Sequence, residues 1–431
     1  MATRRPLAPW GRAAAAARAL AAAAARAATS DNVVCQTEYC GFACAGGWGG
    51  YGGGIMATRR HLAPWGRAAT AARALAAGSD EREVLAALEG KPALYHCLSR
   101  VVDRSFRLGP AEKQQFVLRM RKLEAFCQVR VLTFCVMSNH FHILVEVPER
   151  PSADPTDAEL LDHLATLYGG RRLAEIRWEL EQHRQQGNHA AAEALRQRFL
   201  RRMWDLSAFL QALKHGFSVW FNRRHERKGC LWEERFKSVL VEDGHAARVV
   251  AGYIDLNPVR AGMVKAAADY RWSGYGEAVA GKPQAREGLR QVMLERELAR
   301  SGPRRAVQDV AAWKEVLAGY RQLLAEDAGR RPAHAGNAGG ARAGEGRPVA
   351  GKRAPRPAPP GRGRLSEAEL LHRRVRYFAD GMVIGSGEFV NAVFGLTRGC
   401  FGARRSSGAR TMVRAETSLR TMRALQVDRY G

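Results

Sequence analysis

Two histidines stand out because their spacing suits metal binding. His140 and His142 are separated by one residue in the segment HFHILVEV. Residues two apart on a strand point to the same face, so both imidazoles would share a face with Leu144 and Glu146, and the opposite face would be apolar. Two imidazoles placed in this way can chelate one divalent ion. The alternative is a pair of ordinary histidines on a half-exposed strand.

A tyrosine and an asparagine form a second pair in the segment YIDLNPVRAGMV. Tyr253 and Asn257 are four residues apart, so a helix would place them on one face, a turn apart. Pro258 disfavours the helical conformation at Asn257, so we expect the helix to end there with the amide pointing outward. A tyrosine hydroxyl can act as a nucleophile and an amide oxygen as a metal ligand. The alternative is a core tyrosine followed by a C-cap asparagine.

Basic residues alternate with aromatic residues near this pair. This composition is typical of a surface that binds single-stranded nucleic acid, where cations contact phosphates and rings stack on bases. The candidate phosphate contacts are Lys214, Arg223, Arg224, Arg235, Lys237 and Arg260. The alternative is a solvated basic face beside an aromatic core, in which Trp220 and Phe221 would be at least partly buried. For Arg260 the alternative is a salt bridge.

Alternating strand and helix patterns surround these residues. We expect strands at 93–102, 129–137 and 140–147, the last two joined by a turn at Ser138 and Asn139. Apolar periodicity predicts helices at 111–127, 206–224 and 245–256. The Arg-, Glu- and Gln-rich stretch 169–199 is typical of a charged helix within an insertion.

The overall charge indicates an anionic partner. The 431 residues carry 68 Lys and Arg against 42 Asp and Glu, a net charge of +26, which suits nucleic acid or an anionic membrane surface. No uncharged apolar run is long enough for a transmembrane helix. Eight cysteines in this length do not form a disulfide scaffold, and their scattering favours a reducing cytosol. The cluster Cys35, Cys40 and Cys44 lacks a CxxC motif and is a weak candidate for zinc.

The chain divides into segments of different composition. Residues 1–84 are an Ala-, Arg- and Gly-rich extension in which 1–22 recur almost unchanged at 56–77, so Met56 is an alternative start and the composition also resembles a transit peptide. The remaining segments are a catalytic domain at 85–281 with an insertion near 152–203, a helical extension at 282–328, a basic Pro/Gly linker at 329–363 and a small basic helical module at 364–431.

The two motifs together resemble the Y1-type HUH endonucleases, which include insertion-sequence-200-like and REP-associated tyrosine transposases. The matching pieces, over roughly 93–280, are YHCLSRVVDRSF, VMSNHFHILVEVP, LWEERFKSVLVED, YIDLNPVRAGMV and YRWSGY. The resemblance implies an α+β, ferredoxin-like fold with an antiparallel sheet. It implies that Tyr253 is the nucleophile and that His140, His142 and, with its shorter side chain, Asn257 hold Mg²⁺ or Mn²⁺.

The implied activity is metal-dependent cleavage and joining of single-stranded DNA through a 5′-phosphotyrosine during transposition. Its partner would be single-stranded or hairpin DNA, and no membrane would be involved. The enzyme would work in the bacterial cytoplasm, at the nucleoid, and could form a homodimer. The alternative is a catalytically inactive nucleic-acid-binding protein that keeps the fold. A membrane-surface protein would explain only the first 80 residues. His96 is interpreted as an ordinary core histidine.

Overall fold

The computed structural model describes residues 92–293, 306–325 and 364–422, the last range with gaps at 374–376, 397, 399–400, 402–403 and 413–414. The predictions for the duplicated N-terminal extension, its cysteine cluster and the basic linker therefore lie outside the described residues.

A βαββαβ unit forms the centre of the molecule. Its elements in chain order are β1 (Ala93–Arg100), α5 (Pro110–Cys127), β2 (Arg130–Val136), β3 (His140–Val147), α9 (Leu206–Arg224) and β4 (Lys237–Val241). The strands lie in the order β2-β3-β1-β4, and every neighbouring pair is antiparallel. This order is that of a ferredoxin-like sheet, so the predicted α+β class is confirmed.

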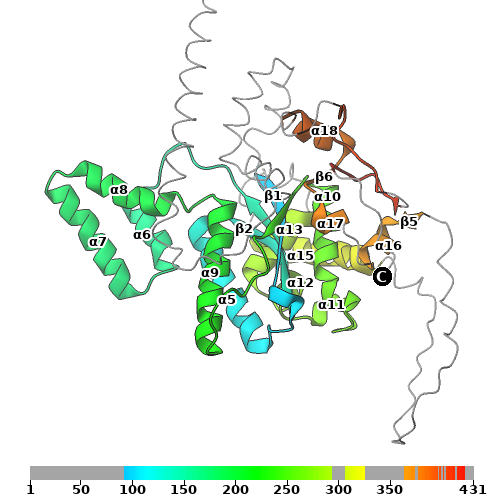
Figure 1. Cartoon of the computed structure of the whole chain (residues 1–431), viewed down its shortest axis with the longest axis horizontal. Helices are drawn as coiled ribbons and strands as arrows, with labels where there is room; N and C mark the ends of the chain where they lie inside the picture. The colour runs from blue at the N-terminus through cyan, green and yellow to red at the C-terminus, as the bar shows by residue number, and fades with distance from the viewer. Residues whose placement is uncertain are drawn as a thin grey trace, which may run out of the picture.

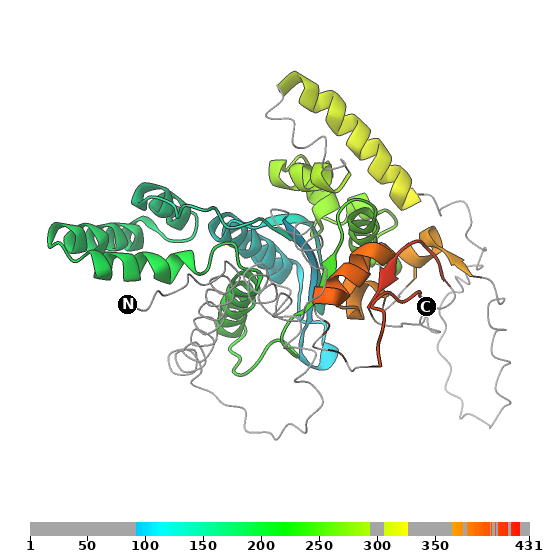
Figure 2. The ribbon, with the colours of Figure 1, turned by 90° about the horizontal axis from the view of Figure 1, so that it is seen from above.

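Helices cover both faces of this sheet (Figures 1 and 2). One face buries Phe141, Ile143 and Val145 of β3 against α5 and α9. The other face, which includes Leu144, packs against α10 (His245–Asp255), α12 (Gly274–Val279) and α13 (Pro283–Met293). The strict alternation of HFHILVEV thus separates two cores, and His140 and His142 belong to the α10 side.

The segment after the linker is not purely helical, which corrects the sequence prediction. Its elements are β5 (Leu365–Ser366), α16 (Glu367–Leu371), α17 (Tyr377–Asp380), β6 (Val383–Gly385), α18 (Gly387–Leu396), β7 (Ala415–Glu416) and β8 (Arg420–Thr421). Strand β6 pairs in parallel with β4, and β8 follows it, so the sheet has six strands and is mixed. Strands of two or three residues are too short to show a period-two pattern, so no alternation predicted them.

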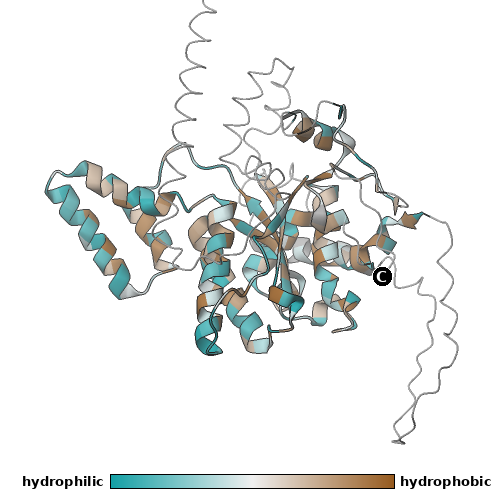
Figure 3. Cartoon of the chain, in the orientation of Figure 1, coloured by the Kyte–Doolittle hydropathy of each residue, from teal (hydrophilic) through white to brown (hydrophobic). Residues whose placement is uncertain are grey.

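The insertion forms a separate helical arm, visible beside the main body in Figure 1. Its helices are α6 (Asp157–Ala165), α7 (Gly170–Gln185) and α8 (His189–Leu200). The single helix predicted for 169–199 is in fact two, because the chain turns at Gly187, whose φ is +69°, and Asn188 caps the start of α8 through a hydrogen bond from the Ala191 amide. Figure 3 shows that α7 is mostly hydrophilic.

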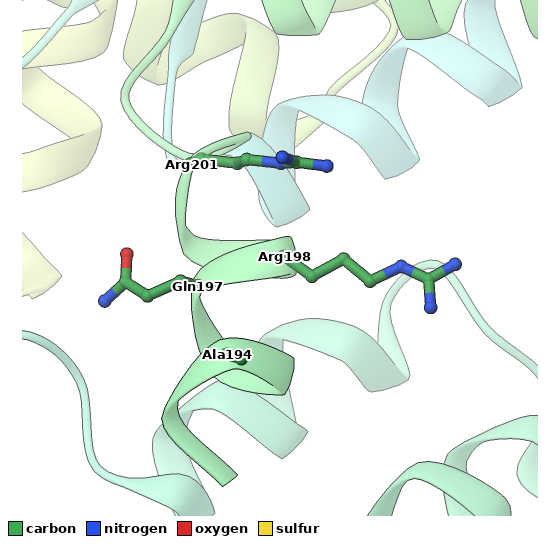
Figure 4. A pocket seen from close by; sticks show the side chains of 4 residues that line it. All are labelled: Ala194, Gln197, Arg198 and Arg201. Carbon is green, nitrogen blue, oxygen red and sulfur yellow. The ribbon is translucent and has the colours of Figure 1, made fainter. Parts of the chain in front are cut away.

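A pocket lies on this arm, away from the two histidines of β3. It is lined by Ala194, Gln197, Arg198 and Arg201 of α8 and the residue after it. Figure 4 shows the Gln197 and Arg198 side chains pointing in opposite directions, so they do not converge on a common ligand.

The remaining described helices are η1 (Val102–Arg104), which follows β1 and buries none of its residues, α11 (Asn257–Arg260), η2 (Ala267–Asp269) and α15 (Ala306–Ala325). In α15, Trp313, Val316 and Tyr320 are buried in the same core as α10. Among the described residues, no helix combines the length and apolar character needed to cross a membrane.

Candidate active site

The two histidines of β3 lie side by side on the α10 face of the sheet. Their ring centroids are 5.1 Å apart and the ring planes are nearly perpendicular. His142 is 5% exposed, whereas His140, the first residue of the strand, is half-buried. Strand β3 is an inner strand that pairs with both β1 and β2, so its side-chain positions are fixed along both edges.

Helix α10 brings the tyrosine to these histidines. The Tyr253 ring centroid lies 6.1 Å from that of His142, and the two rings meet edge to face. Tyr253 is 6% exposed and forms part of the core between α10 and the sheet. The structure therefore brings together the two motifs that the sequence singled out, although they are separated by more than a hundred residues.

Asn257 occupies the first position of α11, where the chain bends after α10. Its side-chain Nδ2 donates hydrogen bonds to the backbone oxygens of Tyr253, at 3.3 Å, and Ile254, at 3.0 Å. The amide nitrogen therefore closes the end of α10 and does not project outward as expected. Only its Oδ1 is then suited to act as a ligand.

Arg260 holds the tyrosine in place from one side. Its guanidinium lies over the Tyr253 ring, 4.2 Å from the centroid, and its Nη2 donates to the Tyr253 backbone oxygen at 2.6 Å. Its Nη1 donates to the backbone oxygen of Leu371, which belongs to the segment after the linker. The arginine thus joins the end of α10 to that segment.

Phe378 of the same segment contacts the tyrosine from another side. The two ring centroids are 4.8 Å apart. Helix α17, which carries Phe378, contacts β1 and β4, and Figure 1 shows it beside α10. Tyr253 is therefore packed between the βαββαβ unit and a segment more than one hundred residues further along the chain.

His96 of β1 is a site residue that the sequence reading missed. Its Nε2 lies 2.9 Å from Nδ1 of His142, and its Nδ1 lies 2.7 Å from the Phe378 backbone oxygen. Burial lowers the pKa of His96 to about 4, against the opposing effect of the hydrogen bond to Phe378. Strand alternation could have placed His96, because Leu94, His96 and Leu98 share one face of β1. Alternation alone does not show that this face is the one that carries His142, because that depends on how β1 pairs with β3.

The electrostatics of the site keep the inner histidine neutral. Burial lowers the pKa of His142 well below its ordinary value, and the nearby His140, His96 and Arg260 act in the same direction. A neutral imidazole is the form that binds a metal ion. Glu146 shares this strand face with the histidines. Its carboxylate forms a 2.9 Å ion pair with Arg130, so it is engaged away from the proposed ion.

The side chains present could supply some, but not all, of the ligands of a divalent ion. Within the described ranges, no group of three or more His, Cys, Asp or Glu side chains is placed to bind an ion. A site built on His140 and His142 must therefore be completed by oxygen donors such as the Asn257 amide, water or a phosphate. Such a partly open set suits Mg²⁺ or Mn²⁺ acting on a phosphate, and Mn²⁺ accepts imidazole more readily.

The predicted phosphate contacts fall into two groups. Arg223 and Arg235 are exposed, and Lys237 is half-buried at the start of β4. Arg224 is exposed as well, with its guanidinium over Trp220 and 3.5 Å from a Glu112 oxygen.

Lys214 belongs to the second, more enclosed group together with Arg260. Its Nζ donates to the Glu234 backbone oxygen at 2.6 Å, and burial lowers its pKa to about 8. As expected, Phe221 is buried and Trp220 is partly buried against the core.

A loop at the end of β1 supplies an aromatic residue that the sequence reading did not single out. Phe106 is 84% exposed, and it lies between the exposed Arg104 and Arg107. The Asn139 side chain donates to the Arg104 backbone oxygen at 2.9 Å, which ties this loop to the start of β3. An exposed large ring between two cations is a candidate for base stacking beside the histidines.

Comparison with known proteins finds a likeness to solved structures but none to a family model or a curated sequence. In fold, the chain resembles a REP-associated tyrosine transposase. That protein, solved bound to a REP hairpin, is 15% identical, with a TM-score of 0.26, and the match covers 44% of this chain and 80% of the other.

Proposed function

We propose that this protein is a metal-dependent single-strand DNA endonuclease and strand transferase that uses Tyr253 as its nucleophile. The observation that carries the proposal is the meeting of Tyr253 with His142 at a ring-centroid distance of 6.1 Å, beside His140. The required groups meet within one chain, so a second copy is not needed to complete the site.

The chemistry proceeds by direct displacement at phosphorus. The Tyr253 hydroxyl gives its proton to water, its oxygen attacks the scissile phosphorus, and the bond to the 3′ oxygen breaks as that oxygen takes a proton from water. The released strand leaves with a 3′-OH, and the other remains attached through a 5′-phosphotyrosine. His140, His142 and the Asn257 oxygen would hold a divalent cation, which would supply positive charge to offset the negative charge of the phosphate. Because the phosphodiester energy is retained in the covalent link, a second strand can be joined without ATP.

The residues around Tyr253 restrict its motion. Arg260 covers one face of its ring, and Phe378 packs against it. A nucleophile fixed in this way loses little conformational freedom on reaching the transition state. We assign Arg260 first to this role, with phosphate contact as the further role that the sequence predicts.

The DNA path that we propose follows the end of the sheet where β3 begins. There Arg100 pairs with His140, Val101 forms a bridge with Trp232, and the Glu233 amide donates to the Arg100 oxygen. The loop that carries Phe106 and the basic segment that follows α9 therefore lie beside the histidines. Cations there would contact phosphates, principally Arg223, Arg224, Arg235 and Lys237, with Lys214 at the inner edge.

The decisive experiment is a search for the covalent adduct. The protein is incubated with end-labelled hairpin-containing single-stranded DNA and Mn²⁺, and products are resolved on a denaturing gel. We expect a DNA–protein adduct that maps to Tyr253 and is lost in Tyr253→Phe, while DNA binding remains nearly unchanged.

Tyr168→Phe in the arm is the matched control, because it removes a half-buried tyrosine hydroxyl that contacts Arg202 at 3.3 Å, away from the histidines. This variant should form the adduct normally. Strong binding of the DNA by the unaltered protein without any adduct would favour the alternative function, a nucleic-acid-binding protein that keeps the fold.

A further inference from the structure

The Nδ1 atoms of His140 and His142 are both engaged in directed hydrogen bonds. An imidazole can offer a lone pair from Nε2 only when the proton of the neutral ring is on Nδ1. What Nδ1 contacts therefore determines whether Nε2 is available as a ligand. In this protein the partner of each Nδ1 is itself hydrogen-bonded to a backbone oxygen. Because a backbone oxygen can only accept, it fixes the direction of every hydrogen bond between it and the histidine.

The first path leads to His140 through Asn139. Because Nδ2 of Asn139 donates to the Arg104 backbone oxygen at 2.9 Å, the amide orientation is fixed and Oδ1 faces His140. Nδ1 of His140 lies 2.6 Å from this oxygen. Since Oδ1 only accepts, His140 must carry its proton on Nδ1.

The second path leads to His142 through His96. The Phe378 backbone oxygen accepts from Nδ1 of His96 at 2.7 Å, so the proton of the neutral His96 ring is on Nδ1 and its Nε2 is an acceptor. Nδ1 of His142, at 2.9 Å from that Nε2, must then be the donor. His96 is completely buried, which favours the neutral ring that this path requires.

We propose that Asn139 and His96 are positioning residues that hold His140 and His142 in the Nδ1–H tautomer, so that both Nε2 lone pairs are presented to the ion. Both ring nitrogens of His96 are engaged, so it acts through His142 and is not itself a ligand. This inference rests on the proposed function for the identity of the ion. It also assigns a task to the segment after the linker, because the oxygen that orients His96 belongs to Phe378.

The tautomers can be observed directly in the full-length, metal-free protein. Long-range proton–nitrogen NMR of ¹⁵N-histidine-labelled protein distinguishes Nδ1–H from Nε2–H rings. We expect Nδ1–H for His96, His140 and His142, assigned by single-histidine substitutions. An Nε2–H ring at His140 or His142 in the unaltered protein would overturn the proposal, and this result needs no variant to fold.

Substitutions then test each path with a matched conservative partner. His96→Leu removes the acceptor for His142, and His96→Gln keeps an oxygen that can accept from it. Asn139→Leu removes the acceptor for His140, and Asn139→Asp keeps it while losing the donor to Arg104. We expect each leucine variant to lose the Nδ1–H tautomer of its partner and to bind Mn²⁺ about 10–100-fold more weakly, whereas the conservative variants restore both.

His163→Leu is the control, because it removes a half-buried histidine of the arm that contacts Gln128. It should leave the His140 and His142 spectra and Mn²⁺ affinity unchanged. If His96→Leu behaves like this control in both measurements, His96 has only a structural role and the inference is wrong.

The same samples separate this inference from the proposed function. Nδ1–H rings and Mn²⁺ binding in a protein that forms no DNA adduct would uphold the positioning roles and reject the nuclease. An adduct at Tyr253 in a protein with Nε2–H rings would uphold the nuclease and reject the positioning roles.

Discussion

Asp255, two residues after the proposed nucleophile Tyr253, connects α10 to three neighbouring elements. Its carboxylate accepts hydrogen bonds from Thr133 of β2, at 2.9 and 3.0 Å, from the Tyr320 hydroxyl of α15, at 2.5 Å, and from the Tyr275 amide of α12, at 3.3 Å. The side chain is completely buried. Burial raises the pKa of Asp255 to about 7, although all these donors favour the ionised form.

Loss of this carboxylate should weaken the whole α10 side of the core. Asp255→Ala leaves the Tyr320 and Thr133 hydroxyls buried without their acceptor, and we expect it to lower the free energy of unfolding by about 3 kcal/mol or more. Tyr320→Phe, which removes one hydrogen bond and leaves the others, should cost about 1 kcal/mol. Urea denaturation measures both. Equal effects of the two substitutions would show that Asp255 does not act as a shared acceptor.

At the level of elements, the packing on the α10 side of the sheet depends on how closely a helix approaches a strand. Helix α13 contacts β2, and at Gly288 an added Cβ would lie 2.4 Å from the Leu132 backbone oxygen and 2.9 Å from its Cα. Leu132 lies where the β2–β3 register shifts. Only glycine permits this approach, because the contacting atoms belong to the backbone and cannot rotate away.

Gly288→Ala should therefore separate α13 from the sheet. We expect a loss of about 1–3 kcal/mol in the free energy of unfolding, the usual cost of overpacking a filled core. The matched control is Gly170→Ala at the start of α7, where an added Cβ meets nothing within 4 Å. That change should be neutral or stabilise by up to about 1 kcal/mol, because alanine favours helix formation. Similar thermal denaturation curves for the two variants would contradict the prediction.

In the molecule as a whole, the segment after the linker docks on the βαββαβ unit through both sheet and side-chain contacts. Strand β6 extends the sheet beside β4, Phe378 contacts Tyr253, and His245 of α10 lies 3.1 Å from a Glu367 oxygen. The hydrogen bond and charge of Glu367 raise the pKa of His245 above its ordinary 6.5, against the effect of burial.

This pair makes the docking depend on pH. Because the folded-state pKa of His245 is raised, its stabilising effect is fully present below about pH 6.5 and is lost as the pH rises through the folded value. The pair is partly exposed, so solvent screening limits the effect to roughly 0.2–1 kcal/mol. Hydrogen exchange of residues 377–385, corrected for intrinsic rates, should show less protection at pH 8 than at pH 6. In His245→Gln this difference should shrink, and an unchanged difference would exclude the pair as its source.

The sequence by itself determined the local elements and the identities of the main chemical groups. Alternation in HFHILVEV placed both histidines on one strand face. Pro258 indicated the region where the helix that carries Tyr253 ends, but that helix stops at Asp255, and Asn257, expected to be non-helical, begins the short helix α11. These features depend on neighbours within a few residues, so a local pattern is enough to predict them.

Only the tertiary structure decided which groups orient the histidines and what packs on the tyrosine. His96 and Phe378 are 282 positions apart in the chain, and their hydrogen bond exists because β1 pairs with β3 while the segment after the linker adds to the opposite edge of the sheet. The amide of Asn257, expected to point outward, instead donates to the end of its own helix. Such partners depend on strand register and on contacts between distant segments, and no period in the sequence records either of them.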